Sequence, residues 1–392
     1  MAPTCSPGRI RTYDQLVNSQ LLYRLSYRGI NHWNIVLLCQ KCQLFFLNFL
    51  YPAGFYLDNI VILHNLRYQH NQPFWIFAQS CSAGDIRFYG STMDLRQKIK
   101  SLAKEKNAVI LAHNYQIAEV QDAADFSGDS LELSQIAAKN DARMIVFCGV
   151  HFMAESASIL SPQKKVVIPD PDAGCPMADM IDPDDVRELK KSHPDAMVVT
   201  YINSSAAVKA LSDVICTSSN ARKIVDRVEA QKIIFLPDKN LGSYIQRFTK
   251  KTIVLGEGFC PTHEKFSPEA LTAVRKEHPD ALVMVHPECR PEVIDMADEV
   301  LSTGQMVKFV QKTDRKKIIV GTESGMIHKL KSAAPDIEFI PAAKSFICPN
   351  MKKINLDKLY RSLSDEETVV TVENSVREKA KKALDRMLEL SY

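Results

Sequence analysis

Three cysteines, Cys175, Cys260 and Cys348, stand at nearly equal intervals of 85 and 88 residues. These intervals are too long for the compact ligand loop of a zinc finger. If the fold brings the three thiolates together, they repel one another unless a cation holds them, so a metal is the natural partner. Three protein ligands leave a coordination position open, which Lewis-acid catalysis requires. The pattern therefore predicts a metal centre with an open position.

Two kinds of centre fit three cysteines, and a third interpretation involves no metal. The first is an iron–sulfur cluster with one iron not bound by cysteine, and the second is a zinc ion held by three cysteines and a water. The alternative is that all three are small buried side chains, the commonest fate of a free thiol. Cys148, Cys216 and Cys289 have no counterparts at the repeat spacing, and we expect them in the core.

Side chains suited to proton transfer and hydrogen bonding recur at the same period as the cysteines. His113, Tyr201 and His286 each end an apolar run, and a hydroxyl residue follows 17 positions later. These hydroxyl residues are Ser130, Ser218 and Thr303. Tyr115, Asn203 and Glu288 lie close behind the same apolar runs. Histidine, tyrosine and glutamate at such positions are the groups that acid–base chemistry uses.

The elements that position these residues repeat as well. The period of 88 and then 85 residues predicts one supersecondary block used three times. Each block reads helix, strand, helix, strand, helix, strand, which predicts a short parallel sheet with helices on both faces. In such sheets ligands bind outside the carboxyl ends of the strands. The marker residues, His113, Tyr201 and His286 with the polar residues close behind them, all fall at such ends.

The sequence thus predicts an α/β fold of three pseudo-symmetric α/β/α sandwich domains around one central site. The repeats are expected at residues 93–177, 178–264 and 265–349. Residues 350–392 are expected to form a C-terminal helical segment that packs on the body, because apolar residues recur there at helical spacing.

Hydroxyl residues also stand where the second helix of each block is expected to begin: Ser130 in the first, Ser218 in the second, and Ser302 with Thr303 in the third. Such residues cap the free N–H groups of a helix start, and the same N–H groups and the helix dipole attract anions. Capping alone explains any single site. Three sites in register favour a ligand with several carboxylates or a phosphate.

The composition excludes several classes of protein. The formal net charge is +3 over 392 residues, so nothing indicates a nucleic-acid partner or a membrane surface. No uninterrupted apolar run reaches the roughly 18 residues that a membrane span needs. Without a recognisable export signal, we expect a cytoplasmic protein whose cysteines serve as thiols, metal ligands or core side chains rather than in disulfides.

Residues 1–92 differ in composition from the rest of the chain. They contain no glutamate, a single lysine, and both tryptophans of the sequence. We expect this stretch to be a non-native, disordered N-terminal extension, with translation starting at Met93. A genuine extension is the alternative, and a peptide from upstream of Met93 in the natural protein would establish it.

Several segments of the repeat region together resemble the quinolinate synthase family, the A protein of de novo NAD biosynthesis. They are "LAHNYQ", "DFSGDSL", "FCGVHFMAE", "DAGCPMADM", "YINSSA", "TSSNA", "FLPDKNLG", "HPEC", "STGQM" and "CPNMKK". The resemblance covers about Met93 to Tyr392. It implies three α/β/α domains in pseudo-threefold arrangement around a 4Fe–4S cluster. It also implies condensation of iminoaspartate with dihydroxyacetone phosphate to quinolinate, and an L-aspartate-oxidising enzyme as functional partner.

The resemblance also assigns residues to the site. Cys175, Cys260 and Cys348 match the three cluster ligands. The positions that match the substrate cavity are His113, Tyr115, Ser130, Tyr201, Asn203, Ser218, His286, Glu288, Ser302 and Thr303.

Among these positions, we expect Glu288 and Tyr115 to transfer protons, with His113 and His286 orienting or polarising carbonyl and carboxylate groups. Tyr201 and Asn203 are expected to bind substrate. Two other functions stay open: a zinc-dependent lyase or hydrolase on the same scaffold, and a non-catalytic iron–sulfur sensor. The density of polar groups at the strand ends argues against the sensor, which needs no such cavity.

Overall fold

The computed structural model describes residues 94–392 throughout and, before them, only the short strands β1–β8. Those strands are Val36–Cys39 (β1), Cys42–Phe46 (β2), Tyr56–Leu57 (β3), Ile60–Ile62 (β4), Leu66–Arg67 (β5), Pro73–Phe74 (β6), Phe77–Ser80 (β7) and Ile86–Tyr89 (β8). The chain divides into two compact units, Met1–Thr92 and Met93–Tyr392. Apart from these strands, residues 1–92 lie outside the described residues. That they are non-native stays a prediction.

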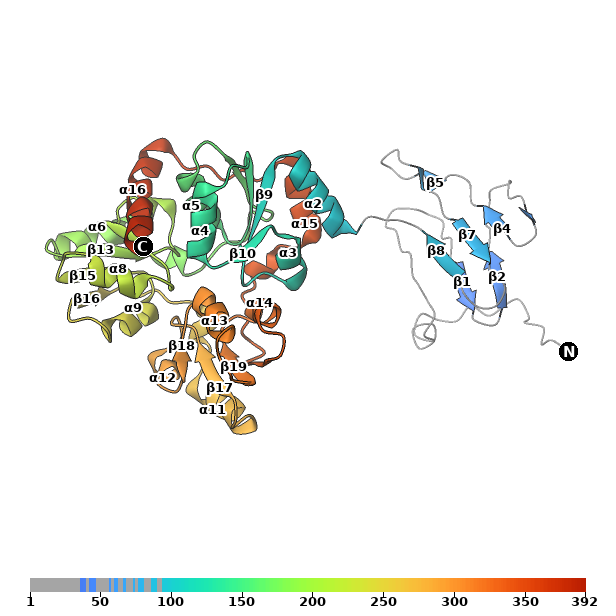
Figure 1. Cartoon of the computed structure of the whole chain (residues 1–392). Helices are drawn as coiled ribbons and strands as arrows, with labels where there is room; N and C mark the ends of the chain where they lie inside the picture. The colour runs from blue at the N-terminus through green and yellow to red at the C-terminus, as the bar shows by residue number, and fades with distance from the viewer. Residues whose placement is uncertain are drawn as a thin grey trace. The chain divides into compact units, whose positions relative to one another are not determined.

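Three four-stranded parallel sheets of one topology make up the second unit (Figure 1). The first has the order β10-β9-β11-β12, with bounds Ala108–His113 (β9), Phe126–Gly128 (β10), Met144–Cys148 (β11) and Lys165–Val167 (β12). The second has the order β14-β13-β15-β16, with bounds Met197–Tyr201 (β13), Val214–Cys216 (β14), Lys232–Leu236 (β15) and Thr252–Leu255 (β16). The third has the order β18-β17-β19-β20, with bounds Leu282–Val285 (β17), Glu299–Val300 (β18), Lys317–Gly321 (β19) and Glu338–Pro341 (β20).

Helices connect and cover these strands. Those around the first sheet are Leu95–Glu105 (α2), Ala118–Ala123 (α3), Ser130–Lys139 (α4) and His151–Leu160 (α5). Those of the second are Ala178–Met180 (η1), Pro183–Ser192 (α6), Ala206–Lys209 (α7), Ala221–Arg227 (α8), Lys239–Gln246 (α9) and Pro261–Glu264 (α10). The remainder are Pro268–Glu277 (α11), Pro291–Ile294 (α12), Thr303–Val310 (α13), Met326–Ala333 (α14), Met351–Lys353 (η2), Leu356–Asp365 (α15) and Asn374–Ser391 (α16). The three-domain α/β/α fold predicted from the repeat is confirmed.

The repeat extends to individual hydrogen bonds. An aspartate stands directly before the edge strand β10, and equivalents precede β14 and β18. The carboxylates of Asp125, Asp213 and Asp298 accept from a backbone N–H of β9, β13 and β17 at 2.8, 2.7 and 2.7 Å. Each aspartate also donates its own N–H to the same strand. These residues lie 88 and 85 positions apart, the period of the sequence repeat.

Local sequence explains where the helices that open the second and third repeats begin. Asp182 caps α6 and Ser267 caps α11, each accepting backbone N–H groups of the first turn, and a proline follows each cap. Such a cap contributes about 1 kcal/mol to a helix, and proline at the first helical position costs nothing because its missing N–H has no intrahelical acceptor there.

The core lies within the strands because parallel sheets are covered on both faces. All five residues of β11, Met144–Cys148, are buried. At the C-terminal end, α15 packs on α2, and α16 packs on α5, α7, α8 and β14, so α16 spans the first two repeats (Figure 1). Helix α16 buries Ala380, Ala383, Leu384 and Met387. Among the described residues, no helix combines the length and the apolar character that crossing a membrane needs. The repeat boundaries at 177, 264 and 349 stay a prediction.

Candidate active site

The predicted marker residues lie at the carboxyl ends of the central strands of the three sheets. His113 is the last residue of β9, Tyr201 is the last residue of β13, and His286 directly follows β17. All three side chains are buried, as is Glu288, which is 3% exposed. A buried carboxylate needs hydrogen-bond donors around it, so its partners show how the site is built.

The carboxylate of Glu288 is held by side chains of the second repeat. The Tyr201 hydroxyl donates to Oε1 at 2.7 Å, and His263 Nδ1 lies 2.8 Å from Oε2. His286 Nδ1 is 3.6 Å from the same Oε2. Asn240 Nδ2 donates to the backbone oxygen of Glu288 at 3.2 Å. The second and third repeats are therefore joined at this carboxylate.

A chain of hydrogen bonds leads from this carboxylate to the first repeat. His263 Nε2 lies 2.9 Å from the hydroxyl of Thr322, which lies 2.7 Å from the hydroxyl of Tyr115. If Nδ1 of His263 carries the proton, it donates to Glu288, and Nε2 accepts from Thr322, which then accepts from Tyr115. The groups predicted to transfer protons, Tyr115 and Glu288, are thus connected through two residues that the sequence analysis did not select.

His113 and His286 share one arrangement. Nδ1 of His113 accepts the backbone N–H of Tyr115 at 3.2 Å, and Nδ1 of His286 accepts that of Glu288 at 3.3 Å. A neutral ring that accepts through Nδ1 carries its proton on Nε2. Each histidine therefore presents an Nε2–H donor, and that of His286 faces the hydroxyl of Ser218 at 3.2 Å.

Burial dominates the electrostatics of these groups. It lowers the pKa of His113 to about 4, and a nearby Lys352 acts in the same direction, while the charge of Glu288 opposes them. It lowers the pKa of His286 to about 3, against the opposing charge of Glu288. Burial and the charge of Glu288 raise the pKa of Tyr115 and Tyr201. Both histidines are neutral donors near neutral pH, and both tyrosines keep their protons.

Glu288 itself remains ionised. Burial by itself raises its pKa, but the hydrogen bonds from His263 and Tyr201 act in the opposite direction, and the pKa lies below its ordinary value. The carboxylate is consequently in the state that accepts a proton, although the same hydrogen bonds make it a weak base.

The helix starts of the three repeats meet one another. Ser219 lies ahead of α8, Asp129 directly before α4 and Ser302 directly before α13. The Ser219 hydroxyl donates to the carboxylate of Asp129 and lies 2.8 Å from the hydroxyl of Ser302. Asn114 Nδ2 donates to the Thr303 hydroxyl at 3.2 Å. The convergence expected from pseudo-threefold symmetry is therefore present at these three helices.

Capping explains some of the predicted hydroxyl residues and not others. Asp129 and Ser302 cap α4 and α13, each within a capping box. Ser130 and Thr303 are the first helical residues of α4 and α13 and do not cap these helices. Helix α8 has no side-chain cap and begins at Ala221, three residues after Ser218. Ser130, Ser218 and Thr303 thus have hydroxyls that capping does not use. Asn203 is half-buried in the turn after β13.

The three cysteines each follow the last strand of a sheet and precede a helical turn. Cys175 comes before η1, Cys260 before α10 and Cys348 before η2. All three are partly buried, and all three pack against the same hydrophobic core cluster. Cys148, Cys216 and Cys289 are completely buried, in agreement with the core position expected for them.

The surroundings of the three thiols suit thiolate ligands once a cation is present. Burial raises the pKa of Cys175 to about 12 and also raises that of Cys260 and Cys348. The charge of Cys348 raises the pKa of Cys175, and that of Cys175 raises the pKa of Cys260. Backbone N–H groups of the following turn act in the opposite direction at each sulfur. Mutually repelling thiols that face N–H donors are a donor set that a metal stabilises.

One group of side chains is compact enough to hold a single metal ion. Ligand atoms of Cys260, His263 and Glu288 lie within 4.8 Å of one another. His263 Nδ1 is 3.2 Å from Cys260 Sγ. This histidine was missed in the sequence, although its place three residues after Cys260 is a spacing that metal sites use.

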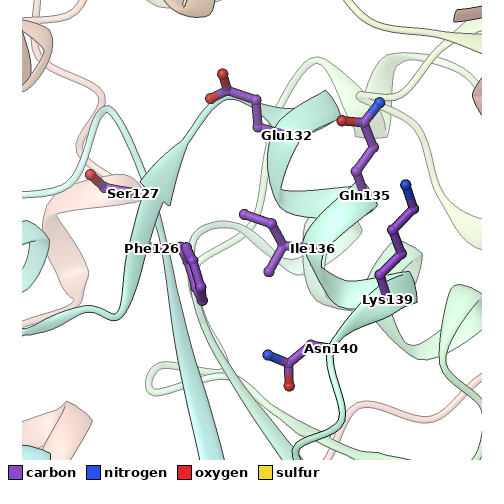
Figure 2. Close-up of a pocket in the computed structure, with 7 residues that line it drawn as sticks. All are labelled: Phe126, Ser127, Glu132, Gln135, Ile136, Lys139 and Asn140. Atoms are coloured by element: carbon purple, nitrogen blue, oxygen red, sulfur yellow. The ribbon is translucent and has the colours of Figure 1, made fainter. Parts of the chain in front are cut away.

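A surface pocket of about 550 Å³ lies elsewhere, between β10 and α4 (Figure 2). Its lining residues are Phe126, Ser127, Glu132, Gln135, Ile136, Lys139 and Asn140. None of the predicted site residues lines it. Because β10 is an edge strand, this pocket belongs to the rim of the first sheet rather than to the site where the repeats meet.

Comparison with known proteins agrees with the resemblance noted in the sequence. The family model described as quinolinate synthetase A protein matches residues 97–389. The chain is 54% identical over 296 residues to a quinolinate synthase of Geobacter sp. (strain M21), an alignment of 76% of this chain and 97% of that protein. It is 54% identical over 297 residues to a quinolinate synthase of Caldicellulosiruptor bescii, covering 76% of this chain and 98% of that protein. A quinolinate synthase of Dehalococcoides mccartyi (strain ATCC BAA-2100 / JCM 16839 / KCTC 5957 / BAV1) is 52% identical over 296 residues, covering 76% and 98%.

Proposed function

The chain belongs to the quinolinate synthase family of enzymes, and we propose that it condenses iminoaspartate with dihydroxyacetone phosphate to give quinolinate, phosphate and water. The observation that carries the proposal is the hydrogen-bond chain from Tyr115 through Thr322 and His263 to Glu288, which draws on all three repeats and lies beside Cys260. An L-aspartate-oxidising enzyme would supply the iminoaspartate.

The substrates match the polar groups of the site. Iminoaspartate carries two carboxylates and the triose carries a phosphate, and anions bind to hydroxyls and free N–H groups at helix starts. We assign the hydroxyls of Ser130, Ser218, Ser302 and Thr303 to these anions, with Tyr201 and Asn203 as further binding groups. The Nε2–H groups of His113 and His286 polarise a carbonyl or carboxylate oxygen. Glu288 accepts a proton and Tyr115 donates one, since carbon–carbon bond formation, imine formation and dehydration all need proton transfer.

Cys175, Cys260 and Cys348 would hold a 4Fe–4S cluster. The support is chemical: three thiols share one core cluster, influence one another electrostatically and face backbone N–H donors. When bound, such a cluster with one iron not held by cysteine supplies Lewis acidity at an open coordination position.

A zinc ion bound by the three thiolates is the competing centre, and it would bring their sulfurs to about 3.8 Å from one another. Over residues 94–392, the group of ligand atoms within 4.8 Å of one another contains Cys260 and neither of the other two cysteines. The three thiols are therefore not gathered as a single zinc ion would hold them.

A zinc-dependent lyase or hydrolase is the second candidate, and the compact group of Cys260, His263 and Glu288 is the observation in its favour. Cysteine, histidine and a carboxylate are all ligands that zinc accepts, with water in the fourth position. A brown protein with visible charge-transfer absorption after anaerobic purification would exclude this candidate. A colourless, active protein loaded with zinc would establish it.

An anaerobic assay of quinolinate formation on the purified full chain tests the proposed reaction. With both substrates, the wild-type protein is expected to form quinolinate and to release phosphate in equal amount. Omission of either substrate serves as the control. A protein that carries its metal centre and forms no quinolinate would contradict the proposal and favour the sensor.

A further inference from the structure

We propose that Glu323 and Lys352 form a positioning pair that ties the backbone at Cys348 to the backbone at Tyr115. The inference rests on the proposed function only for the roles of Cys348 as a metal ligand and Tyr115 as a proton donor. Glu323 follows β19, and Lys352 lies in η2, four residues after Cys348. The pair itself joins chain segments 29 residues apart, at the edge of the site where the first and third repeats meet.

The carboxylate of Glu323 is completely buried and has several donors. Oε1 accepts the backbone N–H of Cys348 at 3.1 Å, and Oε2 accepts that of Gly325 at 2.7 Å. Lys352 Nζ lies 2.9 Å from Oε1 and 3.0 Å from Oε2. Because Glu323 is 0% exposed, these donors replace the water that an ionised carboxylate requires.

Lys352 extends this arrangement into the first repeat. Its ammonium also donates to the backbone oxygen of Tyr115 at 2.5 Å. One carboxylate therefore fixes the N–H of Cys348, and its counter-ion fixes the carbonyl of Tyr115. A displacement at either end would change the donor geometry at the other.

The two loops also approach each other closely at Gly325. A Cβ added at Gly325 would lie 2.7 Å from the backbone oxygen of Gln116 and 2.8 Å from that of Tyr115, so a side chain cannot fit there without displacing the loop. Gln121 Nε2, with its two N–H groups, lies within hydrogen-bond distance of the backbone oxygens of Asn114, Gln116 and Gly325, at 3.1, 2.8 and 3.0 Å. The two loops are therefore in backbone contact, so a shift of one is passed on to the other.

Three variants separate this role from ordinary stabilisation. Glu323→Gln keeps the shape and removes the charge, Lys352→Met keeps the stem and removes the ammonium, and Lys352→Arg restores a cation. The matched control is Asp385→Asn, which breaks the exposed pair of Lys381 with Asp385 on α16, at 2.7 Å. The readouts are kcat and KM for quinolinate formation, the visible spectrum and iron content, the melting temperature, and the alkylation rate of Cys348 in the chelator-treated full chain.

We expect Glu323→Gln and Lys352→Met to lower kcat by about 10- to 100-fold, the usual effect of removing a partner that orients a ligand, with a smaller change in KM. The spectrum of the centre should change in both, and Lys352→Arg should recover part of kcat. In the chelator-treated chain, Glu323→Gln should speed alkylation of Cys348 relative to Cys175. Asp385→Asn should resemble wild type in every readout.

The inference is overturned if both variants of the pair keep the wild-type kcat, spectrum and Cys348 alkylation rate. It is also overturned if they lower the melting temperature alone, as a purely structural pair would. A wild-type chain that makes no quinolinate would instead contradict the proposed function, and the alkylation rate would still test the pair.

Discussion

Replacing Glu288 by glutamine tests the central hydrogen-bond network most sharply, because the side chain keeps its shape. The carboxylate accepts from Tyr201 at 2.7 Å and contacts His263 Nδ1 at 2.8 Å, one on each oxygen. Glutamine offers a single acceptor oxygen, and its NH₂ group faces the other donor. At least one charge-assisted hydrogen bond is therefore lost.

The magnitude follows from these contacts. A hydrogen bond to a charged group contributes about 1.5–3 kcal/mol, so losing one corresponds to about 10- to 150-fold in a rate constant. Loss of a general base contributes about 10²- to 10⁴-fold. We therefore expect kcat of Glu288→Gln to fall by at least about 10²-fold. The variant should also lower the pKa of Tyr201 and Tyr115, because the charge of Glu288, together with burial, raises the pKa of both.

The assay compares anaerobic quinolinate formation by the wild type and Glu288→Gln at equal iron content. Ultraviolet difference spectra against pH report the tyrosine ionisation. Normal turnover by Glu288→Gln with its metal centre intact would remove Glu288 from the mechanism. A drop in turnover that merely follows a loss of iron would mean that the residue supports the centre rather than the chemistry.

Three further predictions concern the relay, the cysteines and a surface cluster. Thr322→Val removes the hydroxyl that links Tyr115 to His263. Loss of a hydrogen bond of about 1.4 kcal/mol corresponds to a fall in kcat of about tenfold, with KM retained. An unchanged kcat would show that the relay is not used. Cys175→Ser should abolish iron binding while Cys148→Ala should keep it, as measured by iron analysis; equal iron in both would contradict the ligand assignment. Glu366→Gln should lower the melting temperature at neutral pH, because hydrogen bonds from Lys165 and Lys106 lower the pKa of Glu366 to about 2. A carboxylate whose pKa is lowered in the folded protein stabilises the fold at pH values above its pKa in the unfolded chain, about 4.3. The difference in melting temperature between wild type and Glu366→Gln should therefore shrink as the pH falls from about 4.3 toward 2. A difference that persists at about pH 2 would refute the ionic explanation.

The sequence repeat was sufficient to predict the three sheets and the ends of their first strands. His113, Tyr201 and His286 were placed correctly because an apolar run that ends in a polar residue marks the carboxyl end of a buried parallel strand. The same rule indicates Thr322 and Glu323, which follow β19, the second central strand of the third sheet.

The contacts between repeats could not be predicted in the same way. His263 and Lys352 have no counterparts at the repeat spacing, so periodicity gives no signal for them. Their importance arises from pairing with Glu288 and Glu323, which lie 25 and 29 residues away in the chain. Asp129 gives no signal in the sequence either, because local capping is enough to explain an aspartate before a helix, while its carboxylate also receives the hydroxyl of Ser219 from the second repeat.

Anaerobic iron and sulfide analysis, with visible spectra, of the wild type and of the single Cys175→Ser, Cys260→Ser and Cys348→Ser variants tests most directly whether the three repeats share one centre. We predict equal iron and inorganic sulfide in a brown wild-type protein, and loss of both from all three variants. A colourless zinc-containing wild type, or a loss confined to Cys260→Ser, would contradict the shared centre.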